Sequence, residues 1–283
     1  MNNFLNEYFE YINRFLISNY PHIKTSYINI DNEKKFIYDE DESPLHNSVI
    51  YLNQKLLNSI SKNLKLLEIG CGVKSIFLDK KNDQFSRKDG LDIHENDFRG
   101  RETLANLIGS VSNIPTRSNF YDYCISNQSI EHWFEYNVSL SVGLSEISRV
   151  LKKKSGKMII NFPLFLHGKS EFAKGNIEYI LKEISNYFIV KEITFIYSES
   201  RKYKGWKKCG QDIYRIRSHV KQKGILSTPE SIVCEIMGEK STYNKKYKIL
   251  KTSKILRFIN LYKDYTFLEL IMKIFNKILS FRK

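Results

Sequence analysis

Residues 64–72, with the sequence Leu-Lys-Leu-Leu-Glu-Ile-Gly-Cys-Gly, constrain the fold of this chain more than any other stretch. An apolar run that ends in Glu68 and leads directly into Gly70 and Gly72 is typical of a buried parallel strand followed by a tight turn. Glycines at such a turn let a ligand lie against the backbone, because no side chain stands in the way. The stretch therefore predicts a nucleotide-type binding loop.

The carboxylate of Glu68 narrows the kind of ligand that this loop can take. A dinucleotide-binding loop points its N–H groups at a pyrophosphate, which a carboxylate two residues before the first glycine would repel. A cofactor with no phosphate and with a cationic amino-acid end tolerates that charge, and S-adenosylmethionine fits this description. Ser75 stands where a G-x-G-x-x-G pattern has its third glycine. A bare tight turn therefore stays open as an alternative at this point.

Length and composition set the broad class. The 283 residues are 42% hydrophobic and 27% charged, which is ordinary for a soluble globular protein with one large core. The sequence contains no uncharged apolar run of about 18 residues and no basic segment at its start, so we expect a cytoplasmic protein that does not span a membrane. The four cysteines are widely spaced, which predicts neither a metal site nor a disulfide framework.

The net charge of +14 is concentrated in two segments. Residues 201–223 carry 9 basic and 1 acidic side chains, and residues 239–283 carry 12 basic and 3 acidic ones. The rest of the chain is close to neutral. This distribution favours local anionic partners over a general affinity for nucleic acid.

Strands and helices are expected to alternate along most of the chain. Apolar spacing predicts helices over 3–18, 46–61, 138–152 and 170–186, and a weak alternation over 25–38 predicts a small hairpin. Strands are predicted over 64–69, 91–93, 107–111, 121–126, 157–162, 187–197 and 230–238. Such an order indicates an α/β fold with a parallel sheet, whose strands end at one edge where ligands bind.

Asp92 is the second residue that points to an adenosine. It lies 22 residues after Gly70, at the end of the second predicted strand of the α/β part. A carboxylate at this place can accept hydrogen bonds from both ribose hydroxyl groups. A turn or helix-capping aspartate is the alternative for the residue alone, but the pattern of Glu68, Gly70 and Gly72 favours the ribose contact.

A series of ordered motifs resembles the class I S-adenosylmethionine-dependent methyltransferases, and most closely their ubiquinone/menaquinone-type small-molecule branch. The resemblance covers roughly residues 60–165, with 187–238 similar to the antiparallel strand pair of the family. The motifs are Leu67-Glu68-Ile69-Gly70-Cys71-Gly72, Gly90-Leu91-Asp92-Ile93, Asn113-Ile114-Pro115, Tyr121 to His132, and Glu146 to Lys152 followed by Gly156.

The resemblance implies a Rossmann-like, doubly wound, mostly parallel seven-stranded sheet with an antiparallel last strand and with helical additions at both ends. We expect an N-terminal helical cap over 1–62 and a methyltransferase domain over 63–238. A basic insertion at 198–229 interrupts that domain, and basic amphipathic helices follow over 239–283.

The resemblance also assigns roles in binding S-adenosylmethionine. It implies that Glu68, Gly70, Cys71 and Gly72 line the methionine portion and that Asp92 and Ile93 hold the ribose and adenine. Ser110 and Val111 would flank the adenine ring, and Asn127 and Gln128 would close the pocket by the sulfonium. Two residues depart from the family pattern: Lys74 stands at a common glycine position, and Ser110 stands where many members have an aspartate that contacts the adenine amino group.

Two histidines are candidates for a general base, because a neutral imidazole near pH 7 suits removal of a proton from a hydroxyl group. His132 follows the fourth strand of the motif series, and in similar small-molecule O-methyltransferases a histidine at this position has that role. A structural role for Glu131 and His132 at the start of the next helix stays open. His167, just after the fifth strand, is the second candidate.

The two basic segments are expected to decide the acceptor and the partners. The insertion interleaves cations with aromatic rings, and Tyr203, Trp206 and Arg215, together with Trp133, are predicted to bind an anionic small molecule or a nucleotide-linked sugar. The alternatives are that this insertion binds RNA or that it is a solvent-exposed loop with no ligand. The apolar face of residues 252–283 suits an anionic membrane surface, the body of the protein or a second copy of the chain.

These features together predict an O-methyltransferase that acts on a sugar or phosphorylated intermediate of a bacterial surface polysaccharide. The protein would be cytoplasmic, with peripheral contact to the inner face of the membrane through its tail. An RNA-directed or N-directed methyltransferase and a catalytically degenerate scaffold of the same fold are the alternatives. Nucleic acid is the less favoured partner.

Overall fold

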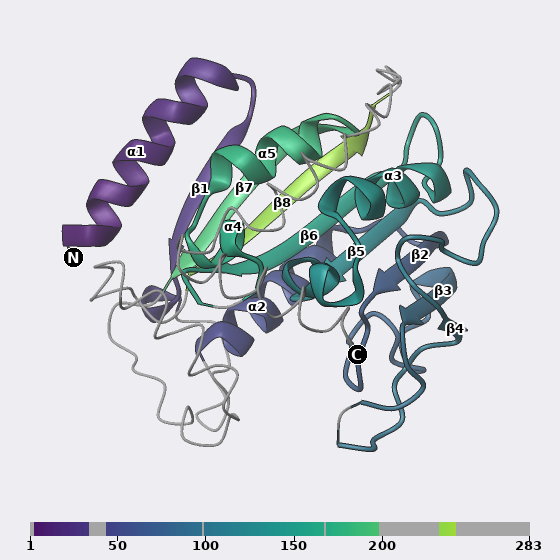
Figure 1. The fold of residues 1–283 in the computed structure, drawn as a ribbon. Helices are drawn as coiled ribbons and strands as arrows, with labels where there is room; N and C mark the ends of the chain where they lie inside the picture. Colours follow the sequence, from purple (N-terminus) through teal and green to yellow (C-terminus); the bar gives the residue numbers. More distant parts are fainter. Residues whose placement is uncertain (1–2, 34–43, 98, 167, 198–231, 242–283) are drawn as a thin grey trace, which may run out of the picture. The chain divides into compact units, whose positions relative to one another are not determined.

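The computed structural model describes residues 3–33, 44–97, 99–166, 168–197 and 232–241 (Figure 1). The chain divides into two compact units, Met1–Tyr243 and Asn244–Lys283, and every described residue belongs to the first. The insertion predicted at 198–229 lies outside the described residues, and so does the predicted tail beyond Ser241. The domain boundaries therefore stay predictions.

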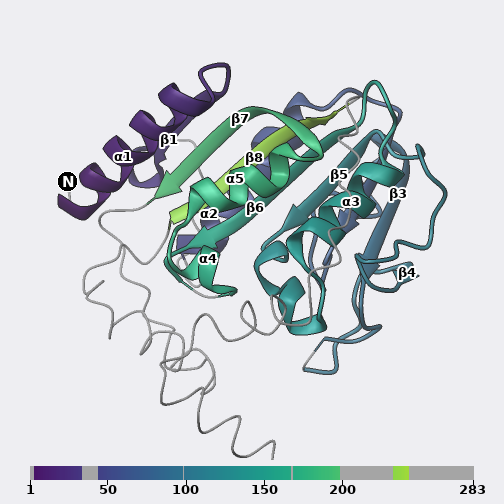
Figure 2. The ribbon, with the colours of Figure 1, turned by 45° about the horizontal axis from the view of Figure 1, so that its top comes forward.

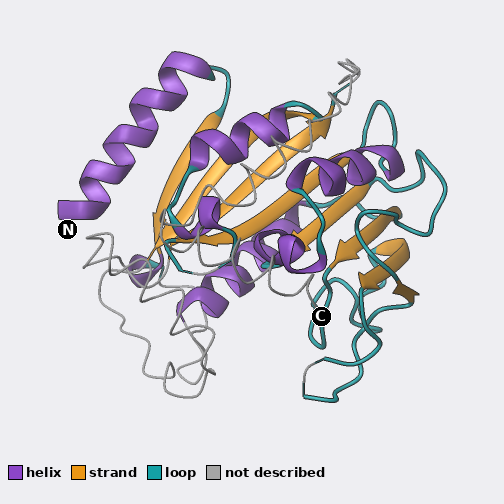
Figure 3. Ribbon diagram, viewed as in Figure 1, coloured by secondary structure: helices purple, strands orange, loops and turns teal. Residues whose placement is uncertain are grey.

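Eight strands form a single sheet in the order β1-β7-β8-β6-β5-β2-β3-β4, with the strands labelled in Figure 1 and drawn in orange in Figure 3. Neighbouring strands are parallel except where β8 pairs with β6 and with β7, which it does in antiparallel fashion. The strands are β1 (Lys24–Asn29), β2 (Leu64–Ile69), β3 (Phe85–Asp92), β4 (Leu107–Ile108), β5 (Tyr123–Asn127), β6 (Lys157–Leu164), β7 (Phe188–Tyr197) and β8 (Ile232–Lys240). The expected Rossmann-like α/β class with an antiparallel last strand is confirmed, with one strand more than the seven predicted.

The additional strand comes from the N-terminal segment, where a hairpin was predicted over 25–38, of which residues 34–38 lie outside the described part of the chain. Residues Lys24–Asn29 form β1, which pairs in parallel with β7 from Glu192 to Tyr197 at the edge of the sheet. A parallel partner 168 residues away leaves no signal in a short sequence window, whereas a hairpin is a local feature. The N-terminal segment is thus more than a helical cap, because it extends the sheet.

Helices cover both faces of the sheet (Figure 2). On one face, α1 (Asn3–Asn19), α3 (Leu140–Val150) and α5 (Ile177–Ser185) pack their apolar sides into one large core that includes Ile160 and Phe195. On the other face, α2 (Pro44–Ser59) packs against β8 near its start and against β2, β5 and β6 near its end. The remaining helices are η1 (Ile30–Asn32), η2 (Ile130–Tyr136) and α4 (Ser170–Ala173).

Strand β3 is longer than the predicted 91–93 because it begins with charged residues. Asp89 is only 2% exposed, and its carboxylate accepts hydrogen bonds from Arg87 (2.6 Å), Tyr121 (2.6 Å) and Asn106 (2.7 Å). These donors compensate the buried charge and hold the pKa of Asp89 below its usual value, although burial alone would raise it. Because β3 starts with polar and charged residues, a search for apolar runs finds only the end of this strand.

The predicted helix over 170–186 is two helices, α4 and α5. Gly175 lies between them with a φ of +65°, and a Cβ atom at this position would lie 2.2 Å from the ring of Phe165. Such a left-handed residue ends a helix, and glycine adopts it without strain. The interruption places Phe165 and the end of β6 against the core.

Candidate functional site

The loop after β2 has the geometry that the sequence predicts. Gly70 has a φ of +66°, and its N–H donates a hydrogen bond to the Leu91 carbonyl oxygen at 2.8 Å. A Cβ atom on Gly70 would lie 2.5 Å from Cβ of Ser129 on the neighbouring wall. Gly72 also has a positive φ, +56°, but no atom lies within 4 Å of its hypothetical Cβ. Gly70 thus permits a close contact between two loops, while Gly72 leaves open space.

Asp92 ties this loop to the end of β3. Its Oδ2 accepts a hydrogen bond from the Gly72 N–H at 3.0 Å, and its Oδ1 accepts one from the Ile93 N–H at 2.8 Å. Each carboxylate oxygen has two acceptor positions, so both oxygens can still receive hydroxyl donors. Asp92 is therefore held in place by the backbone and remains competent to bind a ribose.

Glu68 is buried next to the loop. Its side chain is 2% exposed and accepts hydrogen bonds from Asn127 Nδ2 at 2.9 Å and from the hydroxyl of Ser75. Burial raises the pKa of Glu68 to about 7, although both hydrogen bonds act in the opposite direction. Ser75, at the missing third glycine, thus holds the carboxyl that precedes the loop.

A cavity of about 400 Å³ opens at the carboxyl edge of the sheet, beside the loop. It is enclosed by the loop after β2, the end of β3, the segment after β4, and η2 with the turn that follows it. The lining residues are Ile69, Gly70, Leu91, Asp92, Ile93, Gly109, Ser110, Val111, Gln128, Ser129, His132, Trp133, Glu135, Tyr136 and Val138. A second, wider hollow of about 760 Å³ shares Asp92, Ile93 and Tyr136 with the cavity and adds Gly72 and the segment His94–Asp97.

Most of the site residues predicted from the sequence meet at these two hollows. Those that line them are Gly70, Gly72, Asp92, Ile93, Ser110, Val111, Gln128, His132 and Trp133. Glu68, Cys71 and Asn127 are not among the lining residues of these two hollows. Burial raises the pKa of the Cys71 thiol to about 12. Tyr203, Trp206 and Arg215 lie outside the described residues.

Ser129 and Tyr136 are among the wall residues that were not predicted from the sequence. The Ser129 hydroxyl lies 2.8 Å from the Ser126 hydroxyl and accepts a hydrogen bond from Trp133 Nε1 at 3.3 Å. Tyr136 is 46% exposed and borders both hollows. Both follow β5 within ten residues, and position after a strand end is the one signal that points to them.

His132 lies between two carboxyl groups on the wall of the cavity. Its Nδ1 is 2.6 Å from Glu135 Oε1, and its Nε2 is 3.9 Å from Glu131 Oε1. Glu131 is fully buried, and neither of its carboxyl oxygens has a hydrogen-bond partner among the described residues. Burial raises the pKa of Glu131 to about 7, and the nearby His132 acts against that rise. Such a constellation of ionisable groups in a cavity is typical of a functional site.

The loop that carries His167 packs against the same segment. His167 itself lies outside the described residues, but its neighbour Gly168 has a φ of +89°, and a Cβ atom there would lie 2.6 Å from Cβ of Glu131. The Lys169 N–H donates a hydrogen bond to the Glu131 carbonyl oxygen at 3.0 Å. The two segments that contain the candidate histidines are therefore in contact.

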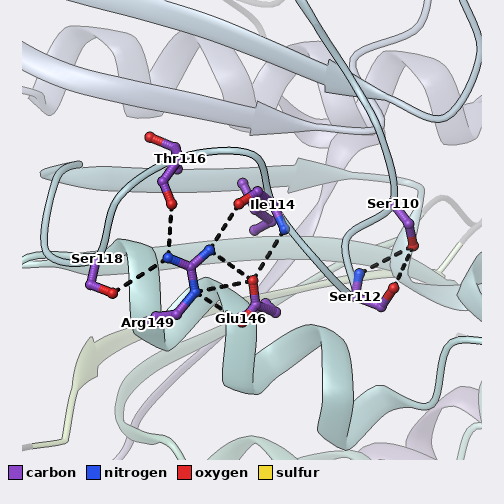
Figure 4. Close-up of polar contacts among 7 residues, drawn as sticks. All are labelled: Ser110, Ser112, Ile114, Thr116, Ser118, Glu146 and Arg149. Carbon is purple, nitrogen blue, oxygen red and sulfur yellow. Dashed lines mark hydrogen bonds and ion pairs between the residues drawn. The ribbon is translucent and has the colours of Figure 1, made fainter.

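Arg149 holds the loop between β4 and β5 onto α3 (Figure 4). Its guanidinium group donates hydrogen bonds to the carbonyl oxygens of Ile114 and Thr116, both at 2.8 Å, and to the Glu146 carboxylate at 2.8–3.1 Å. Glu146 in turn accepts a hydrogen bond from the Ile114 N–H at 3.1 Å. Ser110 and Val111, which line the cavity, lie just before this fixed segment.

Replacement of Arg149 with alanine is expected to loosen that wall. Two carbonyl oxygens lose the guanidinium donor, and the Glu146 carboxylate keeps only the Ile114 N–H. This should cost about 1–3 kcal/mol of stability and weaken binding of S-adenosylhomocysteine about 3- to 10-fold, roughly 1 kcal/mol. Urea unfolding and calorimetry measure the two effects. Arg117→Ala is the matched control, because Arg117 lies on the same loop but contacts the ring of Phe120; an equal loss of affinity in both variants would contradict the role of Arg149.

Comparison with known proteins identifies part of the chain. Residues 67–160 match the model of a family described as a methyltransferase domain. A comparison with curated proteins finds no match. The matched segment runs from β2 to β6 and contains Gly70, Asp92, Ser110 and His132, which line the cavity described above.

Several solved structures are similar to this chain at low sequence identity. The [4+2]-cyclase SpnF is 14% identical, with a TM-score of 0.49 and coverage of 74% of this chain and 87% of that one. A putative methyltransferase from Bacillus halodurans is 12% identical, with a TM-score of 0.47 and coverage of 68% and 98%. The N-methyltransferase NodS from Bradyrhizobium japonicum, in complex with S-adenosyl-L-homocysteine, is 12% identical, with a TM-score of 0.46 and coverage of 75% and 96%.

Proposed function

We propose that this chain methylates a hydroxyl group of a sugar or phosphorylated sugar intermediate. The chain is an S-adenosylmethionine-dependent methyltransferase of class I, with its matched domain at residues 67–160. The product would belong to the assembly of a bacterial surface polysaccharide. The observation that carries the choice of a hydroxyl acceptor is the position of His132. It lines the same cavity as Gly70 and Asp92, so a base candidate and the cofactor loop share one space.

The walls of the two hollows fit S-adenosylmethionine. The open space at Gly72 suits a ligand that approaches the backbone, and the anchored carboxylate of Asp92 suits a pair of ribose hydroxyl groups. Ser110 and Val111 offer one polar and one apolar contact beside the planar adenine. The cofactor supplies an activated methyl group on its sulfonium.

The residues of the chain would mainly align the acceptor and remove its proton. Methyl transfer is an in-line displacement, which favours walls that hold the acceptor oxygen in one direction. As the acceptor O–H bond breaks, Nε2 of His132 would take the proton while Glu135 holds Nδ1. Glu131 would stabilise the resulting imidazolium from 3.9 Å.

The sugar acceptor is supported by the composition of the insertion at 198–229, which lies outside the described residues. Its cations and aromatic rings suit phosphates and planar bases of a nucleotide-linked sugar. The same composition suits RNA, and this alternative predicts binding that weakens steeply with salt. A catalytically degenerate scaffold is the third proposal, and it predicts no transfer to any acceptor.

Incubation of the purified chain with labelled S-adenosylmethionine tests these proposals together. Nucleotide sugars, lipid-free sugar phosphates and total RNA are offered in parallel. Label in a glycan precursor supports the proposal, whereas label in RNA alone would reject it. Binding of S-adenosylhomocysteine without transfer to any substrate would favour the scaffold.

Replacement of His132 with asparagine should lower the rate of methyl transfer at least about 10-fold, because general base catalysis contributes roughly this much or more. Binding of S-adenosylhomocysteine, measured by calorimetry, should stay within about 2-fold, well under 1 kcal/mol. If His132→Asn keeps the full rate, another group must remove the proton of the acceptor hydroxyl. Replacement of His46, which lies on α2 and outside the cavity lining, serves as the control.

We also propose that the tail over 252–283 brings the protein to the inner face of the membrane. The support is its apolar stripe with flanking cations in the sequence. No helix among the residues described by the structure has the length and apolar character needed to cross a bilayer. Sedimentation with anionic liposomes tests the tail: equal recovery of the full chain and of a chain ending at Lys240 would reject membrane contact and favour packing or a homodimer.

A further inference from the structure

The segment 129–133 carries His132 along the wall of the cavity, and three glycines from three different elements approach it closely. The pairs, with the distance from a hypothetical Cβ atom on the glycine, are Gly70 with Cβ of Ser129 at 2.5 Å, Gly168 with Cβ of Glu131 at 2.6 Å, and Gly143 with Cζ3 of Trp133 at 2.4 Å. Carbon atoms that are not bonded to each other stay about 3.5–4.0 Å apart. The segment therefore keeps its place only while these three positions lack a side chain.

Gly143 differs from the other two glycines because its backbone does not require glycine. Gly70 and Gly168 have positive φ angles, whereas Gly143 is the fourth residue of α3 and its N–H donates a hydrogen bond to the Ser139 carbonyl oxygen at 3.1 Å. Glycine is, after proline, the least favourable residue inside a helix. The contact with Trp133 is thus the reason for a glycine at this place in α3.

The ring of Trp133 fills the space beside Gly143. Besides Cζ3, the ring atoms Cε3 and Cη2 lie 2.6 Å and 3.1 Å from the hypothetical Cβ atom. The ring belongs to the large core and lines the cavity, and its Nε1 donates a hydrogen bond to the Ser129 hydroxyl at 3.3 Å. Because protein cores are close-packed, a methyl group on Gly143 would push the ring toward the cavity or push η2 away from α3.

Either movement would displace His132, which precedes Trp133 in η2. The His132 N–H donates a hydrogen bond to the Ser129 carbonyl oxygen at 3.0 Å, and the Trp133 carbonyl oxygen accepts one from the Val138 N–H at 3.0 Å. These bonds hold His132 and Trp133 in one short helical segment, which residues 137–139 join to α3. The place of the imidazole therefore depends on the place of the Trp133 ring.

We propose that Gly143 is a positioning residue for methyl transfer: through the ring of Trp133, it holds η2 so that the imidazole of His132 stays on the wall of the cavity. The inference rests on the proposed function, in which His132 takes the proton of the acceptor. Gly143 lines neither of the two hollows, so it acts on the reaction through Trp133 and not by contact with a ligand.

A double-mutant cycle tests this role. Gly143→Ala adds the methyl group that the ring leaves no room for, and Trp133→Phe shortens the ring that would meet it. The variant with both changes completes the cycle. Val142→Ala is the matched control, because Val142 is the neighbouring residue of α3 and its side chain is exposed.

Two measurements are made on the full chain. One is the ring signal of His132 in protein with ¹³C-labelled histidine, which is identified as the signal that His132→Asn lacks. The other is the rate of transfer to the acceptor identified above. We expect Gly143→Ala to shift or broaden the signal and to lower the rate at least about 10-fold, because small displacements of a reacting group are costly. Val142→Ala should change neither.

In the Trp133→Phe background, the same alanine should change the rate less than about 2-fold and leave the signal in place, because the shorter ring leaves room for it. Thermal unfolding shows whether each variant folds. If Gly143→Ala alone does not fold, a folded double variant would assign the failure to the Trp133 ring and support the inference, and an unfolded double variant would reject it.

Two further results would overturn the inference. A Gly143→Ala variant that behaves like Val142→Ala in both measurements would show that the ring does not hold His132. An equal loss of rate in the wild-type and Trp133→Phe backgrounds would show that the effect does not pass through the ring.

The signal of His132 needs no acceptor, so the inference and the proposed function can fail separately. A signal that moves in Gly143→Ala without a change in rate would confirm that Gly143 holds His132 but refute the proposed role of His132. An unmoved signal would refute the inference and leave the proposed function standing.

Discussion

Replacement of Gly70 with alanine is expected to abolish high-affinity binding of S-adenosylhomocysteine, with a loss of at least about 100-fold, or roughly 3 kcal/mol. The alanine Cβ would lie 2.5 Å from Cβ of Ser129 and 2.7 Å from its hydroxyl, far inside contact distance. The φ of +66° adds strain that glycine does not have. Either the loop or the segment that carries Ser129 and His132 must move, and both line the cavity.

Gly100→Ala separates the crowding at Gly70 from backbone strain. Gly100 has a similar φ of +74°, but no atom lies within 4 Å of its hypothetical Cβ and it does not line either hollow. We expect this control to lose about 1–2 kcal/mol of stability and no affinity. Calorimetry measures the affinity of both variants for S-adenosylhomocysteine, and thermal unfolding measures their stability. An affinity of Gly70→Ala within a few-fold of wild type would contradict the effect of crowding.

The glycine loop after β2 was predictable because its signal is local. Gly70 and Gly72 stand within three residues of each other, and Asp92 comes at the end of the next strand, so strand ends alone bring them together. The same rule gathered Ser110, Gln128 and His132 at one edge. In a parallel sheet, the residues that follow the strands lie next to one another at the same edge. Spacing in the sequence therefore identified most of the residues of the cavity wall.

The features that escaped prediction depend on partners far away in the sequence. Strand β1 finds its partner in β7, and the charged start of β3 is satisfied by Tyr121 and Asn106. The hydrogen bonds that Ser75 and Asn127 donate to the buried Glu68 carboxyl were not predicted either. The hydrogen bond from Asn161 on β6 to Asn127 on β5 likewise joins side chains that become neighbours only once the sheet is assembled.

Glu131→Gln is expected to stabilise the protein at alkaline pH and to leave its stability unchanged at acidic pH. The carboxyl group is fully buried, and burial raises its pKa from 4.5 to about 7. The folded protein therefore keeps the proton that the unfolded chain releases above pH 4.5, and stability falls as pH rises toward and through 7. The neutral amide removes this loss, so the variant should gain about 3 kcal/mol at pH 8.5 and nothing at pH 4.

Urea unfolding at pH 4, 7 and 8.5 measures this difference, with Glu10→Gln on the exposed side of α1 as a control that should show no pH-dependent gain. A gain that is the same at every pH would mean that Glu131 does not titrate as a buried group. A residue that costs stability at working pH is retained for another reason, and His132 at 3.9 Å supplies one. Glu131→Gln should therefore be the more stable protein and the slower enzyme, because the imidazolium of His132 would lose a carboxylate that stabilises it.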